Sequence, residues 1–237
     1  MNVLVFDTST NNFSLSIIKD KKIVLNLSKN INKTYSKFLI PILKLSLKKS
    51  NLDIKEINYI LTSLGPGSFT GIRIGIAVAK GIGITSKAKI LGYSNMDVLA
   101  NAINIDLKGK KIVTVIKSKN KDYYFQIFNH KKTAINKIST FSIDSLPRIF
   151  FHKNLIFSGD LDIKLINKLK NKKTIFYKKK PNAYILSNLF EKSNMLKMTK
   201  VLNPILFFED KNVNDVISCK VISADKKLGL KVQPIGC

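Results

Sequence analysis

The sequence predicts an α/β protein of two similar lobes, each built around a mixed β-sheet. The first third of the chain reads as three strands followed by alternating helices and strands, and the part after residue 109 begins with a similar strand pattern. The 237 residues are 45% apolar, which is enough for a sizeable core. We expect the lobe boundary at Lys108-Gly109-Lys110, which divides the chain into 1–108 and 109–237.

The opening strands are the clearest part of the pattern. Asn2–Phe6 is a short apolar run that ends at Asp7. Phe13–Ile18 alternates apolar and polar residues, and Ile23–Leu27 follows after a short polar turn. Three consecutive strands with tight turns indicate an antiparallel meander.

Helices and strands then alternate. A helix with two apolar faces is expected over Thr34–Lys48, and such a helix needs two surfaces to pack against. Tyr59–Leu64 reads as a buried strand, Ser68–Ser86 as a second helix, Lys89–Leu91 as a strand and Val98–Ile103 as a third helix. This order is one half of the actin-like, sugar-kinase-like fold, the ribonuclease H-like architecture of the ASKHA proteins.

The second half repeats the pattern less clearly. Residues 110–138 give two strands and a weak third one. This pattern resembles that of residues 2–27, as expected for a duplicated fold. Lys117 ends the first of these strands, where Asp7 ends the corresponding strand of the first lobe. The elements expected further on are a helix over Ile143–Phe151, a strand over Leu155–Phe157, a helix over Leu161–Leu169, a strand over Thr174–Tyr177 and a helix over Ala183–Lys192.

The segment LTSLGPGSFTGIRIGIAVAKGIGITS (61–86) contains six glycines and two charged residues. Its first glycines form a strand-to-helix turn that exposes backbone N–H groups at a helix N-terminus, a geometry that binds anions. The segment is neither a Walker loop nor a G-x-G-x-x-G motif. The candidate anion or nucleotide contacts are Asp7, Gly65, Gly67, Ser68 and Thr70.

A competing interpretation of the Asp7 turn stays open. The turn Asp7-Thr8-Ser9-Thr10 has no glycine, so its side chains could satisfy their own backbone instead of a phosphate. The glycines inside the helix also have another use. Gly71, Gly75, Ala79 and Gly83 recur every four residues and form a smooth strip for close packing, internal or with a partner.

No catalytic or metal-binding constellation is present, so we expect no catalytic residues and no metal. His130 and His152 are isolated, and the two cysteines have no C-x-x-C spacing. Asp160 and Asp162 read as an ordinary helix cap. The sequence shows no secretory signal and no membrane span, so a reducing compartment, the cytoplasm, is expected.

The net charge of +26 suggests a polyanionic partner such as RNA. However, only Arg73 and Arg148 are arginines, and the remaining 39 of the 41 basic residues are lysines. Proteins that read nucleic acid specifically favour arginine. The charge therefore also fits A/T-rich codon drift on a solvated surface, with non-specific, salt-dependent attraction for RNA.

Three stretches of the chain resemble one family. They are MNVLVFDTST at the start, YSKFLIPIL (35–43) and GPGSFTGIRIGIAVAKGI (65–82), of which the last is long and specific. Together they resemble the TsaB (YeaZ) family, bacterial proteins of tRNA threonylcarbamoyladenosine modification. The resemblance is strong over about residues 1–105 and weak afterwards.

The resemblance implies an accessory subunit with an actin-like fold and no working active site. Its partners would be a catalytic TsaD-type paralogue and a TsaE-type ATPase, with tRNA bound through the complex. It would hold no cofactor by itself, although a nucleotide could bind at the partner interface.

The resemblance also implies where the partner binds. The contact would be a helical bundle of Thr34–Lys48 and Ser68–Ser86, formed with the paralogue or, alone, as a homodimer. The residues expected in this contact are Tyr35, Phe38, Leu39, Ile42, Arg73, Ile76 and Lys80.

The second lobe departs from the family pattern, since Lys117-Ser118-Lys119-Asn120-Lys121-Asp122-Tyr123-Tyr124 stands where Asp-Ala-Arg-x-x-Glu-Val-Tyr is frequent. Two alternatives therefore stay open. One is an active small-molecule kinase of the same superfamily, which would need Asp7 and a second-lobe acid to hold Mg-nucleotide. The other is a tRNA-binding module that uses the second-lobe lysines.

Overall fold

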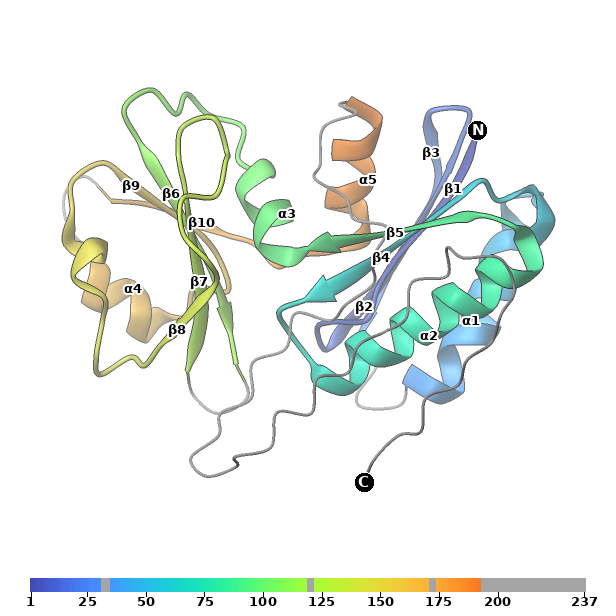
Figure 1. The fold of residues 1–237 in the computed structure, drawn as a ribbon, viewed down its shortest axis with the longest axis horizontal. Helices are drawn as coiled ribbons and strands as arrows, with labels where there is room; N and C mark the ends of the chain where they lie inside the picture. The colour runs from blue at the N-terminus through green and yellow to red at the C-terminus, as the bar shows by residue number, and fades with distance from the viewer. Residues whose placement is uncertain (31–34, 119–121, 171–173, 193–237) are drawn as a thin grey trace, which may run out of the picture.

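The computed structural model describes residues 1–30, 35–118, 122–170 and 174–192, and these form two five-stranded mixed sheets that lie side by side (Figure 1). The α/β fold of two lobes with mixed sheets is thereby confirmed.

In the first sheet the strands follow the order β3-β2-β1-β4-β5. The central strand β1 pairs antiparallel with β2 and parallel with β4. The register places Asp7, the last residue of β1, opposite Ser14 of β2. The strand bounds are β1 Asn2–Asp7, β2 Asn12–Lys19, β3 Lys22–Asn30, β4 Tyr59–Gly65 and β5 Lys89–Ser94.

The second sheet repeats this topology. Its order is β10-β9-β6-β7-β8, with β6 antiparallel to β7 and parallel to β9. Strands β6 to β10 therefore correspond one by one to β1 to β5, which confirms the internal repeat. The bounds are β6 Lys111–Lys117, β7 Tyr123–Phe128, β8 Ser139–Phe141, β9 Leu155–Gly159 and β10 Ile175–Lys178.

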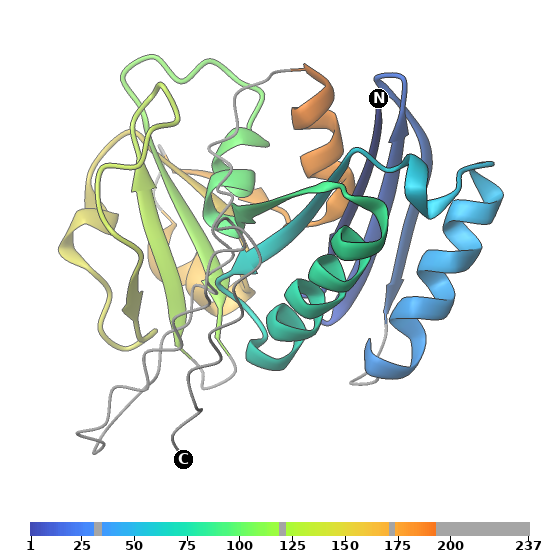
Figure 2. The same cartoon turned by 45° about the vertical axis from the view of Figure 1, so that its right-hand side comes forward.

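Helices α1 (Tyr35–Lys49) and α2 (Phe69–Ser86) cover one face of the first sheet (Figure 2). Leu39, Leu43 and Leu47 are spaced at helical intervals and are buried against that sheet. Pro41 stands inside α1, where the structure keeps the helix continuous and leaves the proline exposed.

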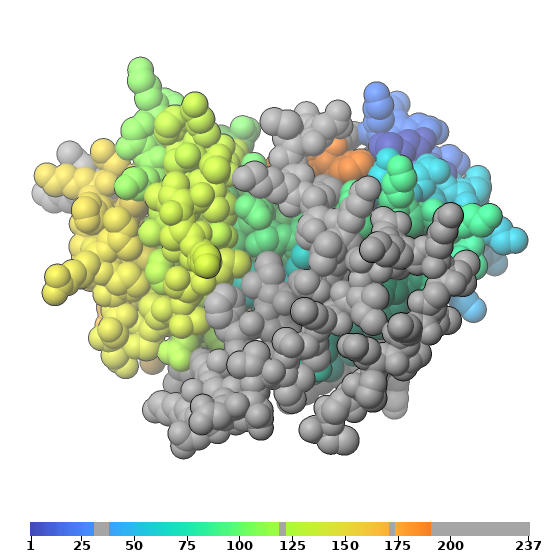
Figure 3. All heavy atoms as spheres, viewed as in Figure 1, coloured from blue at the N-terminus to red at the C-terminus, as the bar shows by residue number. Residues whose placement is uncertain are grey.

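The helices that end the two repeats lie between the sheets. In Figure 3 the yellow atoms of the second lobe and the blue atoms of the first lobe lie at opposite sides of the molecule. Helix α3 (Asn95–Asn101) follows the first sheet but packs Met96 and Leu99 into a cluster with β6 and β9, and Ser158 Oγ donates to Leu99 O at 3.0 Å.

Helix α5 (Ala183–Lys192) makes the reciprocal crossing. It follows the second sheet but packs on the first, where Ala183 and Leu186 join the cluster of Val3 and Val5, and Ala183 N donates to Ser14 Oγ at 2.9 Å. This helix lies in the range 109–237 predicted as the second lobe, and yet it contacts the first sheet. The boundary near residue 109 stays a prediction.

The predicted helix over Ile143–Phe151 is wrong. Only a 3-10 helix over Arg148–Phe151 (η2) forms there, because Pro147 has no N–H to donate and disfavours helical geometry in the residue before it. The third strand of the second lobe is Ser139–Phe141, just after the stretch in which it was expected.

Other helix boundaries shift by a few residues. Helix α3 begins at Asn95, because Ser94 Oγ accepts from Met96 N at 3.2 Å and caps it. Helix α4 is Ile163–Leu169 and packs on the second sheet, while η1 (Ile54–Glu56) is a short 3-10 turn before β4.

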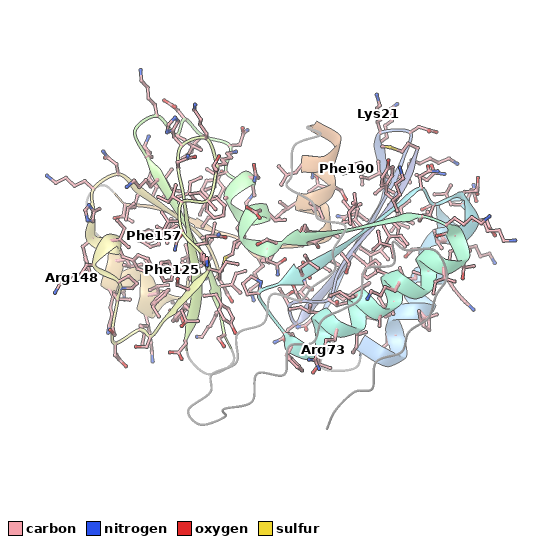
Figure 4. The ribbon with its side chains drawn as sticks, viewed as in Figure 1. Lys21, Arg73, Phe125, Arg148, Phe157 and Phe190 are labelled. Carbon is pink, nitrogen blue, oxygen red and sulfur yellow. The ribbon has the colours of Figure 1, made fainter. Side chains whose placement is uncertain are left out.

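Aromatic rings fill the core of the second lobe. Figure 4 labels Phe125 and Phe157 within this lobe. Phe125, Phe141 and Phe150 meet edge to face with ring centroids 5.0 to 5.7 Å apart, and Phe150 meets Phe157 in the same way at 5.3 Å. This geometry stabilises aromatic pairs beyond the burial of their area.

Gly159 provides a test of the second-lobe packing. It ends β9 at φ 130°, and an added Cβ would overlap the Val115 carbonyl and lie 3.1 Å from Leu99 Cδ1. Gly159→Ala should therefore lower the free energy of unfolding by about 2–5 kcal/mol, the sum of backbone strain and overpacking.

Gly109→Ala is the matched control, since Gly109 also has a positive φ (68°) but open space around it. It should cost only about 1–2 kcal/mol. Urea unfolding of both variants measures the difference, and equal losses would contradict the close approach.

Candidate functional site

The carboxylate of Asp7 is hydrogen-bonded within its own turn. Asp7 is fully buried at the end of β1, and its Oδ1 accepts hydrogen bonds from Ser9 N at 2.7 Å and Ser9 Oγ at 2.6 Å. The geometry matches the competing interpretation of the turn as one that satisfies its own backbone.

Asn95 connects this turn to the first sheet. Its Nδ2 donates to Ser9 Oγ at 2.7 Å and to Pro66 O at 2.9 Å, and its Oδ1 accepts from Ser63 Oγ at 2.8 Å. Ser63 Oγ also accepts from Gly65 N at 3.0 Å. No pattern in the sequence indicates this role of Asn95, because its partners are 29 to 86 positions away.

Burial raises the pKa of Asp7 to about 6, and the hydrogen bonds from Ser9 oppose this only in part. The second carboxylate oxygen and the Tyr93 hydroxyl are both buried without a well-formed hydrogen bond to any described residue. Burial, and after it the charge of Asp7, raises the pKa of Tyr93 well above its usual range. Asp7 is therefore a buried carboxyl that binds a proton more tightly than a free one.

Gly67 in the turn before α2, and Gly71 and Gly75 inside α2, make possible the close approach of α2 to the Asp7 turn. A Cβ at Gly67 would overlap the Ser9 carbonyl, one at Gly71 would overlap the Thr8 carbonyl, and one at Gly75 would overlap Thr8 Oγ1. Thr8 Oγ1 donates to Gly71 O at 2.7 Å. The first two glycines of the strip, Gly71 and Gly75, therefore pack internally against the turn that follows β1.

The candidate anion contacts come together, but most are occupied by protein groups. Ser68 N donates to Ser9 O at 2.6 Å, and Ser68 Oγ caps α2 by accepting from Gly71 N at 3.3 Å. Gly65 is buried, whereas Thr70 lies at the surface. Whether an anion binds here stays a prediction.

The second lobe carries a cation at the corresponding place. Lys117, the last residue of β6, forms a salt bridge with Asp162 at 2.8 Å, and Tyr123 Oη donates to the same carboxylate at 2.6 Å. Asp162 also caps α4 by accepting from Leu165 N at 2.9 Å, as the sequence indicated. Burial opposes ionisation of Asp162, but the bonds from Lys117, Tyr123 and Leu165 outweigh it and lower its pKa to about 2.

These residues do not fit a Mg-nucleotide held between the lobes. Such a group needs accessible carboxylates, but Asp7 is buried beneath α2 and Asp162 is neutralised by Lys117. Across the described ranges, no three His, Cys, Asp or Glu side chains group together as metal ligands.

The predicted partner surface divides into exposed and buried residues. Phe38 is 46% exposed, and Arg73 is exposed above the Phe69 ring, with its guanidinium carbon 3.8 Å from the ring centroid. Ile42 and Lys80 are half-buried, and burial lowers the pKa of Lys80.

Leu39 and Ile76 are in the first-lobe core, with 1% and 5% exposure, so they support the helices rather than present a surface. The side chain of Tyr35 lies outside the described residues.

The exposed face of α2 is longer than the sequence indicated. Ile84 is 83% exposed and lies three helical turns from Arg73 on the same side. Ala77 and Gly81 are exposed between them, so this stripe has little bulk at its centre. On α1, Ile40 and Leu45 are also exposed. We call Phe69, Arg73, Ala77, Gly81 and Ile84 the α2 outer face.

The two sheets of equal strand order define a duplicated actin-like fold. In this chain Ser9 and the start of α2 cover the turn after the first strand. A family model described as "TsaD: tRNA N6-adenosine threonylcarbamoyltransferase" matches residues 27–217. The TsaB protein of Buchnera aphidicola subsp. Schizaphis graminum is 31% identical over 194 residues, 76% of this chain and 89% of that protein. The chain belongs to the TsaB (YeaZ) family.

A second relative covers nearly the whole chain. The TsaB protein of Buchnera aphidicola subsp. Baizongia pistaciae is 30% identical over 237 residues, 98% of this chain and 96% of that protein. Both relatives carry the name tRNA threonylcarbamoyladenosine biosynthesis protein. The solved structure of YeaZ from Pseudomonas aeruginosa has the same fold, with a TM-score of 0.65, 17% identity, and coverage of 81% of this chain and 93% of that one.

Gly71 and Gly81 test the internal role of the glycine strip. Gly71→Ala should lower the free energy of unfolding by about 1–3 kcal/mol, because the new methyl group overlaps the Thr8 carbonyl. Gly81 has nothing within 4 Å of an added Cβ, so Gly81→Ala should raise stability by up to about 1 kcal/mol through helix propensity. Thermal unfolding measures both, and a neutral Gly71→Ala would contradict the sealed turn.

Asp7→Asn tests the buried carboxyl. The folded pKa of about 6 exceeds the ordinary 3.8, so the native state binds more protons and wild-type stability falls as pH rises from about 4 through 6. The asparagine side chain carries no charge, so the variant should gain up to about 3 kcal/mol over the wild type above pH 7 and almost nothing below pH 4.

Urea unfolding between pH 4 and 8 measures this dependence. Asp144→Asn is the control, because the Asp144 side chain is 89% exposed and its surface ion pair with Lys168 should matter little. A variant that is less stable than the wild type at pH 8 would show that Asp7 is stabilised as the anion.

Proposed function

We propose that this chain is a non-catalytic scaffold subunit for the transfer of a threonylcarbamoyl group to the adenosine next to the anticodon of tRNA. In this proposal it acts in the cytoplasm with a TsaD-type catalytic paralogue and a TsaE-type ATPase, and it meets tRNA through their complex. The observation that carries the proposal is the two-sided use of α2. One side seals the Asp7 turn, and the opposite side is exposed.

The sealed side supports the absence of catalysis. A phosphotransferase of this fold needs its first-strand aspartate to reach a metal ion, but Asp7 binds Ser9 and lies under the glycines of α2. In the other lobe Lys117 occupies the corresponding strand end. Both features weigh against the alternative of an active small-molecule kinase.

The exposed side supports a partner. Isolated apolar side chains on a surface need no explanation, but the α2 outer face places Phe69, Ala77 and Ile84 in one row, and the neighbouring helix α1 also exposes apolar residues. The small residues in the middle allow another helix to approach closely. The Arg73 guanidinium stacks on the Phe69 ring, and arginine is among the residues enriched where protein interfaces gain most of their binding energy.

The names of the relatives supply the pathway. Two TsaB proteins that are at least 30% identical are described as tRNA threonylcarbamoyladenosine biosynthesis proteins. The matching family model is that of the transferase, which supports a partner of related fold. Without that paralogue, the same α2 face would pair two copies of this chain.

Ile84→Glu is the variant that tests the interface. Ile84 is 83% exposed, so the change should not affect folding, but it places a charge in the proposed contact and should weaken binding to the TsaD-type paralogue at least about tenfold. Ile163→Glu is the matched control, since Ile163 is 72% exposed on α4 of the other lobe and should bind normally.

Binding is measured by calorimetry, and function by reconstitution of the paralogue, the ATPase, threonylcarbamoyl-AMP and tRNA with each variant or with this chain omitted. Ile84→Glu and omission should both abolish most of the modification. Normal binding by Ile84→Glu would overturn the interface, and full modification without this chain would overturn the function.

A further inference from the structure

A second surface feature lies at the amino ends of the parallel strands, at the end of the sheet opposite to Asp7. There the starts of β1, β4 and β5 and the carboxyl end of α2 surround an open pocket of about 520 Å³. The pocket is lined by Met1, Lys55, Ile57, Asn58, Tyr59, Ser86, Lys87 and Lys89. Three of these residues are lysines and none is acidic.

The three lysines are not neutralised by neighbouring acids. In the part of the chain that the structure describes, Lys55, Lys87 and Lys89 form no salt bridge. The acids at this end have other partners. Asp20 pairs with the terminal ammonium of Met1 at 2.8 Å.

The two other acids close to the pocket are used by the backbone of η1. Asp53 accepts from Lys55 N at 2.8 Å, and Glu56 accepts from Asp53 N at 2.6 Å, which makes a capping box. The β2–β3 turn adds Lys21 to the same end of the sheet (Figure 4). The acids at this end keep their charge, but no carboxylate of the described residues lies within salt-bridge distance of Lys55, Lys87 or Lys89, so the three ammonium groups can contact an anion directly.

Lys87 occupies a position that favours glycine. It ends α2 in the left-handed conformation at φ 59°, ψ 16°. A non-glycine residue there costs roughly 1–2 kcal/mol, and glycine is the usual residue after a helix. A cation near the partial negative charge of a helix C-terminus stabilises the folded protein by only about 0.3–1 kcal/mol. Lys87 therefore occupies a position that its backbone conformation does not favour.

An aromatic ring forms one wall. Tyr59 is half-buried, with Lys89 Nζ 6.0 Å from its centroid and Phe190 packed behind it at 6.5 Å. The ring supplies an apolar surface next to the cations. Basic side chains combined with an aromatic surface are the usual features of sites that hold nucleic-acid strands without reading their sequence.

We propose that this pocket binds the phosphate backbone of RNA. The pocket is open and rimmed by three point charges, whereas a site for a free nucleotide is an enclosed cavity with mainly apolar walls. Lysine is a flexible point charge without the planar fork of arginine, so it suits phosphate contacts better than base recognition. Binding should therefore depend weakly on sequence and strongly on salt.

The proposal is independent of the scaffold function, because it concerns RNA binding by the isolated chain. It also differs from a general attraction by the net charge of +26, because it assigns the contact to three residues of the first lobe. The alternative of an RNA-binding module based on second-lobe lysines makes the opposite assignment.

The test compares two triple variants of the full chain that each remove three positive charges. The pocket variant is Lys55→Gln, Lys87→Gly and Lys89→Gln. The control variant is Lys131→Gln, Lys137→Gln and Lys153→Gln, three exposed lysines of the second lobe. Fluorescence anisotropy measures the binding of an unmodified tRNA transcript between 50 and about 200 mM salt, the range in which phosphate contacts are lost.

The pocket variant should bind at least about tenfold more weakly and should reduce the slope of log K against log salt by about 2, the value for three phosphate contacts with a single strand. The control variant should keep most of the affinity. Equal losses in both variants would overturn the proposal in favour of general electrostatic attraction.

Two further measurements distinguish RNA binding from a purely structural role of Lys87 and from a site for small anions. Lys87→Gly alone should keep or raise the melting temperature while it weakens tRNA binding. A lower melting temperature with unchanged tRNA binding would mean that Lys87 only compensates the helix dipole. Binding of inorganic tripolyphosphate or ATP that is lost in the pocket variant, while tRNA binding is unaffected, would overturn the assignment to RNA.

Discussion

The structure depends on the close approach of α2 to the turn that follows β1. Ser68 N donates to Ser9 O at 2.6 Å, and Thr8 Oγ1 donates to Gly71 O at 2.7 Å, so the backbone of a helix meets the backbone of a turn with no side chain between them. This contact buries Asp7 and fixes the orientation of α2 on the sheet. It thereby determines which face of the helix is exposed to solvent or available to a partner.

Duplication explains the rest of the architecture. Each sheet has the same strand order, and the helix that ends each repeat packs toward the other sheet, which binds the two lobes into one body. The residues at the end of the first strand differ in charge between the two lobes. One holds the buried carboxyl of Asp7, and the other holds the Lys117–Asp162 pair, a cation in place of the acid. At neither strand end does the residue that ends the first strand of the repeat offer an accessible carboxylate.

Local sequence patterns predicted the helices and strands better than the tertiary contacts of their side chains. The alternation of Phe13–Ile18 and the apolar spacing of α1 predicted a strand and a helix that the structure contains. The prediction of a helix over Ile143–Phe151 is wrong. The apolar spacing of this segment favours a helix, but Pro147 prevents one from running through it. Asn95 could not be identified, since an asparagine beside a helix start usually caps it, and only the fold brings Ser9, Ser63 and Pro66 around its amide.

The sequence by itself determined that GPGSFTGIRIG contains a strand-to-helix turn followed by a helix with a strip free of side chains, because glycine spacing and helix period are local properties. Only the tertiary structure decided which surface uses that strip. Gly71 and Gly75 of the strip, and Gly67 in the turn before it, face the Asp7 turn of the same chain, while Gly81, which lies outside the strip, is open to solvent. The four glycines look alike in the sequence, and the difference between them is the position of a turn some sixty residues away, which no local pattern encodes.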